Sequence, residues 1–447
     1  MILIKNGFIV TMDKQRRMFK NGLVVIEGNK IIDVGDYEQL KGKYPENDIV
    51  IDAKGKLIMP GFICTHTHMP YVLGHNMPVD FSKHKSFIEL LTKWAWPMLE
   101  DQIRKEDIYA ASRFAAMKML ESGTTCINEM VEAPFDIPGC LDYTAKAVEE
   151  VGIRAVVAYE VTERISLENA EEGIKENIRF IEKWNKQKDS RIRGRIGVHT
   201  CFTNSEETLR RVRELADKYG SGIHIHIAES TYEVEYIKKK YGKTPVQFMH
   251  DIGFLKSDVL AAHCIHLTDE DLKLMKEDDV KVSHTPMSNM LGACGVAKIP
   301  DMIDMGITVS LGHDCFFTLD IFEYMRAAFL LHKIHRLNPL VMPPHYVLEM
   351  VTTNGARALS LDKEIGSIEP GKKADIVIFN IRSPTPIDEI TLASTVVNDF
   401  NGKDVDIVIV DGKIVVENGV IKTVDKQEVI SKCQERTLEL WRRNKLI

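Results

Sequence analysis

Residues 56–70, KLIMPGFICTHTHMP, decide the fold of this chain. An apolar run leads directly into His66 and His68, which stand two residues apart. If the run is a β-strand, alternate side chains leave it on one face, so both imidazoles point to the same place. Two nitrogen ligands aimed at one point are the beginning of a metal site. The same spacing also occurs in histidines that are hydrogen-bonded in a protein core. The rest of the sequence is therefore needed to distinguish metal ligands from core residues.

Between about residues 56 and 364, short apolar runs alternate with amphipathic stretches such as KEDIYAASRFAAMKMLESG. This alternation predicts an α/β fold with parallel strands, and eight strands fit a closed (β/α)8 TIM-like barrel. The competing architecture is an open doubly wound sheet, but no GxGxxG opens a helix after the first strand. The predicted strands are residues 57–66, 123–130, 153–160, 193–200, 221–229, 258–264, 280–285 and 306–314.

The two ends of the chain share a different pattern. Residues 1–55 and 365–424 alternate apolar residues around Gly, Asn-Gly and Asp-Gly turns, which is typical of short paired strands. We expect them to form one small composite β-sandwich domain beside a catalytic barrel of residues 56–364. Residues 425–447 have helical spacing of apolar side chains and are expected to form a C-terminal helix.

Length and composition restrict the possible partners. The chain has 447 residues, 44% hydrophobic and 28% charged, and a net charge of −7, so it has no basic excess for nucleic acid. The opening MILIKNGFIV does not resemble a signal sequence, and no apolar run is as long as a membrane span. The eight cysteines form no CxxC pair. We expect a cytoplasmic protein that acts on a small molecule, without nucleic-acid or membrane partners.

Polar side chains gather where the predicted barrel strands end. In such barrels the loops that leave the C-terminal strand ends form the active site. One histidine at a strand end means little, because a buried or loop histidine is common, but here six strands carry such residues. They are His66 and His68, His199, His226 and Glu229, His263, His284, and Asp314.

Three imidazoles and one carboxylate suit zinc or ferrous iron and leave a position open for water, whose pKa the metal lowers. His66, His68, His226 and Asp314 form such a set. His224 shares a strand face with His226, but His226 lies nearer the strand end and is preferred. The fourth strand ends without a lysine that could bridge two metals. We therefore expect one divalent metal ion, zinc with iron as the alternative.

Glu229 follows His226 by three residues and could pass a proton from the water to the substrate as general acid and base. The alternative is a solvated loop glutamate. His263 could hold the attacking hydroxide by a hydrogen bond and stabilise developing charge. His199 is then free to contact the substrate.

These motifs resemble the amidohydrolase superfamily, in its cytosine-deaminase-like branch of methylthioadenosine/S-adenosylhomocysteine deaminases, guanine deaminases and triazine chlorohydrolases. The resemblance covers nearly the whole chain and rests on PGFICTHTHMP, HIAE, AAHCIHL, VSHTPMSNMLGACGVAKI, ITVSLGHDC and IEPGKKADIVIFN. It implies a distorted (β/α)8 barrel with a composite β-sandwich and a mononuclear metal site. It also implies the following roles: His66, His68, His226 and Asp314 bind the metal, Glu229 and Asp314 relay protons, His263 orients the hydroxide, and His199 contacts the substrate.

Two departures from the family pattern concern the substrate. His313-Asp314-Cys315 replaces the usual Thr-Asp-Gly. The nucleoside deaminases carry a ribose-binding glutamate two residues after a proline in the first long loop, whereas Glu100 stands three residues after Pro97. Ribose recognition by Glu100 is therefore an open question. The aromatic residues of this loop either stack on a flat heterocycle or pack as a lid; they are Tyr71, Phe81, Phe87, Trp94 and Trp96.

We expect a metal-dependent aminohydrolase that deaminates an amino-substituted purine or purine nucleoside, of the adenosine, methylthioadenosine or S-adenosylhomocysteine type, and releases ammonia. The expected substrate contacts are Trp96, Glu100, His199 and Glu229. The alternatives are a deaminase of guanine or a pterin, a triazine chlorohydrolase, or, from another class, an inert adaptor with this fold. The C-terminal helix and the first long loop are expected subunit contacts of a homo-oligomer.

Overall fold

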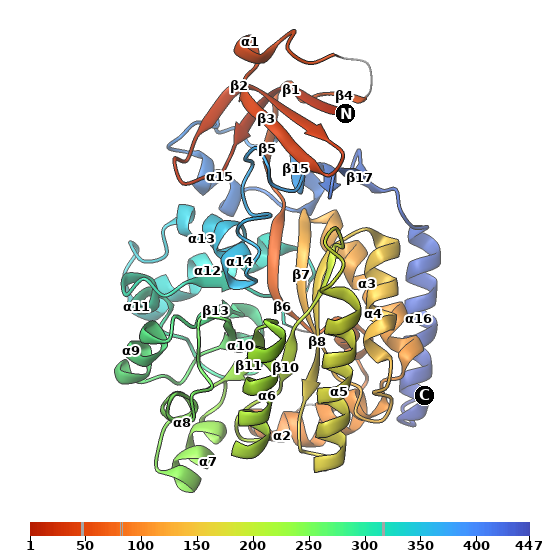
Figure 1. The fold of residues 1–447 in the computed structure, drawn as a ribbon, viewed down its shortest axis with the longest axis vertical. Coiled ribbons are helices and arrows are strands. Elements are labelled where there is room, and N and C mark those ends of the chain that lie inside the picture. The colour runs from red at the N-terminus through yellow and green to blue at the C-terminus, as the bar shows by residue number, and fades with distance from the viewer. Residues whose placement is uncertain (46–48, 81, 83, 315–317) are drawn as a thin grey trace.

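The computed structural model describes residues 1–45, 49–80, 82, 84–314 and 318–447. Its strands form two sheets, one built from both ends of the chain and one from the middle. In Figure 1 the first sheet caps one end of the barrel, and α2 lies at the opposite end. The end sheet contains β1 (Ile2–Val10), β2 (Met18–Glu27), β3 (Lys30–Asp36), β4 (Ile49–Asp52), β5 (Lys56–Pro60), β15 (Ile376–Asn380), β16 (Val405–Val410), β17 (Lys413–Glu417) and β18 (Val420–Ile421).

The middle sheet is a barrel of parallel strands in the order β6-β7-β8-β10-β11-β12-β13-β14, with β9 beside β8. The barrel closes where Thr67 pairs with Asp314. These findings confirm the predicted TIM-like barrel and the sheet formed by both chain ends. The strands are β6 (Phe62–Thr67), β7 (Thr124–Val131), β8 (Arg154–Val161), β9 (Ile192–Gly194), β10 (Ile196–Val198), β11 (Ile223–Ile227), β12 (Val259–His263), β13 (Lys281–His284) and β14 (Val309–Leu311).

Helices cover the outside of the barrel (Figure 1). Helices α6 and α7 begin at serine caps and end at left-handed glycines: the Ser205 side chain accepts the Thr208 N–H in the first turn of α6, and Gly220 ends that helix at φ 59°. The helices are α1 (Tyr37–Leu40), α2 (Phe87–Leu90), α3 (Lys105–Glu121), α4 (Cys140–Val151), α5 (Leu167–Trp184), α6 (Glu206–Tyr219), α7 (Thr231–Tyr241), α8 (Pro245–Asp251), α9 (Asp269–Glu277), α10 (Pro286–Leu291), α11 (Ile299–Asp304), α12 (Ile321–Arg336), α13 (Pro344–Met350), α14 (Thr353–Ala358), α15 (Leu392–Asn398) and α16 (Lys426–Arg443), with short turns η1 (Met69–Gly74), η4 (Glu100–Gln102) and η5 (Gly402–Asp404), and a π-helix, η3 (Leu91–Leu99).

The run predicted as the first barrel strand is divided between the two sheets. β5 pairs with β1 and β15 in the end sheet, whereas β6 pairs with β7 in the barrel. Gly61 stands between them, where a Cβ atom would lie 2.1 Å from Thr125 Oγ1, so a larger residue does not fit. The chain therefore passes from one sheet into the other without a loop. The domain limits given above stay predictions.

The C-terminal helix α16 packs against α3 of the same chain (Figure 1). Its apolar residues Val429, Cys433 and Leu440 are buried, and Arg436 and Arg443 form ion pairs with the buried Asp107. These three apolar residues are thus covered within one chain, and the expected role of the helix in subunit contacts stays a prediction. In the part of the chain that the structure describes, every helix is too short or too polar to span a membrane.

A buried ion pair joins the barrel to the end sheet. Arg154 on β8 binds Asp375, beside β15, through two contacts of 2.7 and 2.9 Å, and their side chains are only 4% and 2% exposed. We expect Arg154→Leu to lower the free energy of unfolding by about 3–5 kcal/mol, because the carboxylate is left buried without its partner. Urea denaturation measures the loss. The double variant Arg154→Leu/Asp375→Leu should recover much of it, and a single-variant loss below about 1 kcal/mol would contradict the expectation.

Candidate metal centre and active site

The four predicted metal ligands converge at the point where the barrel closes. The Asp314 N–H donates to His66 O (2.9 Å) and the His68 N–H donates to Asp314 O (3.1 Å), so the backbone itself brings β6 and the end of β14 together. Asp314 Oδ1 lies 3.3 Å from His66 Nε2 and 3.5 Å from His68 Nε2. His226 Nε2, from β11, lies 3.2 Å from His68 Nε2. All four side chains are buried. Among the described residues, the donor atoms of His66 lie within 4.8 Å of those of His68 and Asp314 in one group, and of those of His226 and His263 in another.

The hydrogen bonds of these rings suit a bound cation. The Nδ1–H of His68 donates to Met130 O (3.0 Å), and that of His226 donates to His199 O (2.8 Å). Each ring therefore turns an unprotonated Nε2 toward the other, and two lone pairs 3.2 Å apart repel each other unless a positive charge lies near them. Burial lowers the pKa of His66 to about 4 and that of His226 well below its ordinary value. Neutral rings with a carboxylate are a donor set for a divalent metal such as zinc.

His224 lies behind this cluster rather than in it. Its Nε2 is 2.9 Å from His66 Nδ1, and its Nδ1 is 2.5 Å from Asn128 Nδ2. Burial lowers the pKa of His224 well below its ordinary value, so the ring is neutral. His224 is thus placed to orient His66, and the preference for His226 as the ligand stays a prediction.

We expect His224→Ala to weaken metal affinity by about 10- to 100-fold, because an outer hydrogen-bond partner fixes the orientation and tautomer of a ligating histidine. Competition with a chromogenic chelator measures the affinity. The exposed His345 provides the matched control, His345→Ala, which should bind metal like the unaltered protein. Equal affinities for all three proteins would rule out this role of His224.

Glu229 and His263 stand beside the cluster, at the ends of the neighbouring strands β11 and β12. His263 Nδ1 lies 3.5 Å from Glu229 Oε1, and His263 Nε2 lies 3.8 Å from Asp314 Oδ2. The His263 ring is fixed by a hydrogen bond to Asn289 Oδ1 (2.9 Å). Burial raises the pKa of Glu229 to about 8, so this carboxyl holds a proton at neutral pH.

Three of the strand ends have left-handed backbones. Ala228, His263 and Asp314 have φ of 50°, 67° and 62°. Such conformations are uncommon outside glycine and tend to gather at functional sites. The left-handed conformations turn the backbone sharply at these strand ends. The side chains of His263 and Asp314 nevertheless point toward the predicted metal ligands.

A cavity extends from the cluster under the first long loop. Phe87, Leu90, Leu91, Trp94 and Ala95 form its apolar cover. Of the aromatic residues expected to stack or pack there, Tyr71, Phe87 and Trp94 line the cavity, whereas Phe81 lies outside the described residues, as does Cys315 of the altered eighth-strand motif. The polar lining consists of His68, Glu100, Glu132, Glu160, His199, His226, Glu229, Ser288 and Asp314.

His199 lines the cavity at the end of β10 and has its Nδ1 fixed by Thr203 Oγ1 (2.8 Å). Trp96 meets His199 edge-on, with ring centres 5.9 Å apart, and its ring centre also lies 5.2 Å from the Arg164 guanidinium. The cavity lining includes Trp94 but not Trp96. His284, the strand-end residue of β13, is directed elsewhere: its Nε2 lies 3.1 Å from His332 Nε2.

Glu100 reaches the cavity although it stands one place later than the family pattern. The segment before it, η3, is a π-helix that contains Pro97. A π-helical turn holds one residue more than an α-helical turn, so it absorbs the extra residue. The Glu100 side chain is buried, bonded to the Tyr71 hydroxyl and 2.9 Å from Arg164 Nη2. The shift in sequence is therefore compensated in space.

Sequence reasoning missed an acidic wall on the β7 and β8 side of the cavity. Glu132 directly follows β7 and contacts His68 Nδ1, and Glu160 lies in β8, 3.9 Å from both His199 Nε2 and His226 Nδ1. Burial, with repulsion between neighbouring carboxylates, raises the pKa of both well above the ordinary value. Both residues stand at strand ends, but a glutamate at such a position is usually solvated, so the strand-end rule alone does not distinguish them from surface residues.

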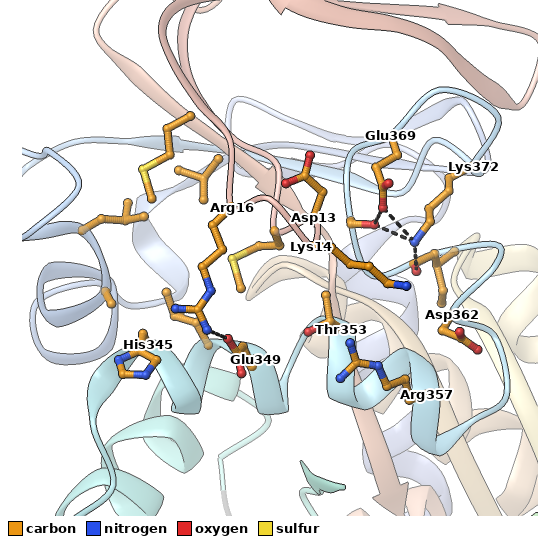
Figure 2. Close-up of a pocket in the computed structure, with 18 of the residues that line it drawn as sticks. Asp13, Lys14, Arg16, His345, Glu349, Thr353, Arg357, Asp362, Glu369 and Lys372 are labelled. Atoms are coloured by element: carbon orange, nitrogen blue, oxygen red, sulfur yellow. Dashed lines mark hydrogen bonds and ion pairs between the residues drawn. The ribbon is translucent and has the colours of Figure 1, made fainter. Parts of the chain in front are cut away.

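A second cavity lies at the junction between the end sheet and helices α13 and α14 (Figure 2). Its charged side chains are largely paired with each other: Arg16 with Glu349, and Lys372 with Glu369 at 3.3 Å. Among the described residues, the groups that could hold a metal include none of its members. The cavity beside His226 is therefore the candidate active site.

Comparisons with known proteins agree with this geometry. The family model described as "Amidohydrolase family" matches residues 57–415. The chain is 39% identical over 443 residues to a protein named 5'-deoxyadenosine deaminase from Methanosarcina acetivorans, with 98% of each chain covered. It is 38% identical to a 5-methylthioadenosine/S-adenosylhomocysteine deaminase from Syntrophomonas wolfei, covering 98% of this chain and 99% of the relative. A crystal structure of an adenosine deaminase from Xanthomonas campestris with bound zinc has the same fold, with a TM-score of 0.90, 24% identity and 98% of both chains covered. This chain belongs to the amidohydrolase family.

Proposed function

We propose that this protein is a metal-dependent deaminase of purine nucleosides of the adenosine type, including 5'-deoxyadenosine, methylthioadenosine and S-adenosylhomocysteine. The observation that carries the proposal is the convergence of His66, His68, His226 and Asp314 beside a buried, proton-bearing Glu229 in one cavity. The names of the relatives support the substrate class.

His66, His68, His226 and Asp314 would hold one divalent ion. When bound, such an ion lowers the pKa of water toward neutrality and so supplies a nucleophile. Zinc is the proposed metal and iron the alternative, because neutral imidazoles with one carboxylate suit both. Metal analysis of the purified protein, followed by removal and replacement of single ions, distinguishes them.

The side chains around the metal centre transfer protons during the deamination. Glu229, which carries a proton at neutral pH, delivers it to the ring nitrogen beside the reacting carbon and recovers one from the next water that enters. His263 donates or accepts a hydrogen bond at the attacking oxygen. Asp314 takes the remaining proton of that oxygen and delivers it to the departing amino group, which leaves as ammonia. Each group lies within 3.8 Å of a partner in this set, so the transfers need no large movement.

Glu100, His199 and Trp96 are the proposed substrate contacts besides Glu229. Glu100 lies in the cavity and, like the family's ribose-binding glutamate, can accept hydrogen bonds from a ribose diol. His199 lines the same cavity on the β10 side, where it can contact the base. Trp96 would act through its packing on His199 and Arg164.

The test is ammonia release from a panel of substrates by metal-loaded protein: 5'-deoxyadenosine, methylthioadenosine, S-adenosylhomocysteine, adenosine, guanine, a pterin and a chlorinated triazine. We expect the adenosine-type nucleosides to be converted to their inosine counterparts. Conversion of guanine or the pterin alone, or release of chloride from the triazine alone, would overturn the proposal in favour of those alternatives. A folded protein that binds no metal and converts nothing would favour the inert adaptor.

We also propose a homo-oligomer in the cytoplasm. The seven described cysteines are buried free thiols, which suits a reducing compartment. Since α16 is covered by α3, the proposed contact is an exposed apolar patch on α10 and α12, where Ile334 and Leu337 are 70% and 84% exposed. We call it the α12 patch; it consists of Met290, Leu291, Leu330, Ile334, Leu337 and Leu340.

We expect Ile334→Glu to shift the protein from oligomer to monomer at micromolar concentration, because a charge is then buried in an apolar interface. Sedimentation velocity measures the mass. His335→Glu, an exposed change on the same helix, is the control and should stay oligomeric. A monomeric unaltered protein, or an unchanged mass for Ile334→Glu, would contradict this contact.

A further inference from the structure

The acidic wall of the active-site cavity carries more carboxyl groups than the proposed reaction uses. Glu100, Glu132 and Glu160 line it, and Asp101 stands just behind. Arg164 is engaged with Glu100 and Asp101, at 2.9 and 2.8 Å. Two carboxyl groups, those of Glu132 and Glu160, thus face the cavity without a lysine or arginine partner. Their ionisable neighbours are histidine rings: His68 for Glu132, and His199 and His226 for Glu160.

Glu132 is the clearest case. Its side chain is 5% exposed and lines the cavity. Its Oε1 contacts His68 Nδ1 without the geometry of a hydrogen bond, and its Oε2 accepts no well-formed hydrogen bond within the described structure. The one carboxyl group in hydrogen-bond contact with it is that of Glu160. Two buried carboxyl groups in contact repel each other unless a proton or a cation lies between them. Because this pair lines the substrate cavity, it can bind a positively charged group of a substrate.

A second metal ion fits this pair poorly. Among the described residues, four groups have donor atoms within 4.8 Å of one another, and none of them contains Glu132 or Glu100. Glu160 appears in one group only together with His68 and His226, which the first ion would occupy. The carboxyl groups of Glu100, Glu132 and Glu160 are therefore too far apart to bind one small ion together. An organic cation with several N–H donors could contact them at the same time.

The position of the wall indicates which part of the substrate it meets. Glu229 and His263, which handle the reacting amidine, come from β11 and β12. Glu132 and Glu160 come from β7 and β8, across the barrel and beyond His68 and His226. A nucleoside whose base is held by Glu229 therefore directs its sugar end toward this wall.

We propose that Glu132 and Glu160 form a cation subsite, which selects adenosine-type nucleosides that carry a positively charged amino group on the 5' substituent. The inference rests on the proposed nucleoside deaminase function. The ammonium group would donate hydrogen bonds to both carboxylates, and charge-assisted bonds of this kind are about twice as strong as neutral ones.

The test compares pairs of ligands that differ only at the 5' position. Adenosine and 5'-amino-5'-deoxyadenosine are the substrates, and their deaminated products, inosine and 5'-amino-5'-deoxyinosine, allow binding to be measured by calorimetry without turnover. We expect the amino compound of each pair to be favoured by about tenfold or more in kcat/KM and in Kd at pH 7, and adenosine 5'-monophosphate to be a poor substrate.

Glu132→Gln should bring both ratios close to one, and Glu160→Gln should reduce them in the same direction. If either variant fails to fold, as judged by its thermal unfolding, the other carries the test. Glu176→Gln changes a buried glutamate outside the cavity and is the matched control, which should keep the full preference.

The other possible outcomes each contradict either the cation subsite or the proposed function. Equal affinities for inosine and its amino derivative, with adenosine still deaminated, overturn the cation subsite and leave the proposed function intact. A preference that survives both variants overturns the assignment to Glu132 and Glu160, and so does binding of a second equivalent of zinc or manganese lost in Glu132→Gln. Failure to deaminate or bind any nucleoside overturns the proposed function itself.

Discussion

The His226→Ala variant is expected to lose its metal and at least about a thousandfold in kcat, because without the ion the pKa of the attacking water returns from near 7 toward about 15.7. His226 supplies one of three imidazoles, and its Nε2 lies 3.2 Å from that of His68. Metal content by mass spectrometry and ammonia release from 5'-deoxyadenosine measure the two effects.

His250→Ala is the control for this prediction. His250 lies on α8, pairs with Asp278 at the surface and is remote from the cavity lining. It should retain a full equivalent of metal and full activity. Prolonged dialysis of the unaltered protein against a chelator should reproduce the loss of activity, and one equivalent of zinc should restore it. A His226→Ala protein with normal metal and activity would refute the proposed centre.

The second large effect is expected for Glu229→Gln. Glutamine preserves the shape of the side chain but cannot carry a proton, so kcat should fall by about 10²–10⁴-fold while one equivalent of metal stays bound. Glu235→Gln, an exposed change on the following helix, should leave kcat unaffected. Loss of metal together with activity would instead identify Glu229 as a ligand.

The pH dependence follows from the raised pKa of Glu229, about 8. As the pH rises through this value the carboxyl loses its proton, so kcat should fall above about pH 8. The neutral carboxyl is also the form favoured by folding, so its contribution to stability is complete below pH 4.5 and is lost as the pH rises through about 8. Thermal unfolding of the metal-free protein should therefore be less pH-dependent in Glu229→Gln than in the unaltered chain.

The barrel and the converging residues could be predicted from sequence because both depend on local regularities. The period of the apolar runs indicates parallel strands, and parallel strands share one C-terminal edge, so residues far apart in the chain, such as His66 and Asp314, must meet there. The choice of His226 over His224 needed only their distance from the strand end. The roles of these residues stay proposals that the variants above test.

Other features could not be predicted, for reasons that concern backbone geometry. The place of Glu100 depends on the π-helix η3, and nothing in the apolar pattern distinguishes a π-helical turn from an α-helical one. The division of residues 57–66 between two sheets depends on the close approach of Gly61 to Thr125. Glu132 and Glu160 stand at predicted strand ends, but a glutamate at such a position is usually solvated, and only burial in three dimensions reveals the difference.

The composition of the end sheet from both chain ends affects how the protein folds during its synthesis. Strand β5 pairs on one side with β1 and on the other with β15, so that Ile58 faces Ile378. On the ribosome the first sixty residues emerge long before their partner does, with an unpaired, apolar strand edge exposed throughout the synthesis of the barrel. This sheet therefore stays incomplete until β15 has been synthesised, and a nascent chain stalled before β15 presents a ready surface for chaperones or for aggregation.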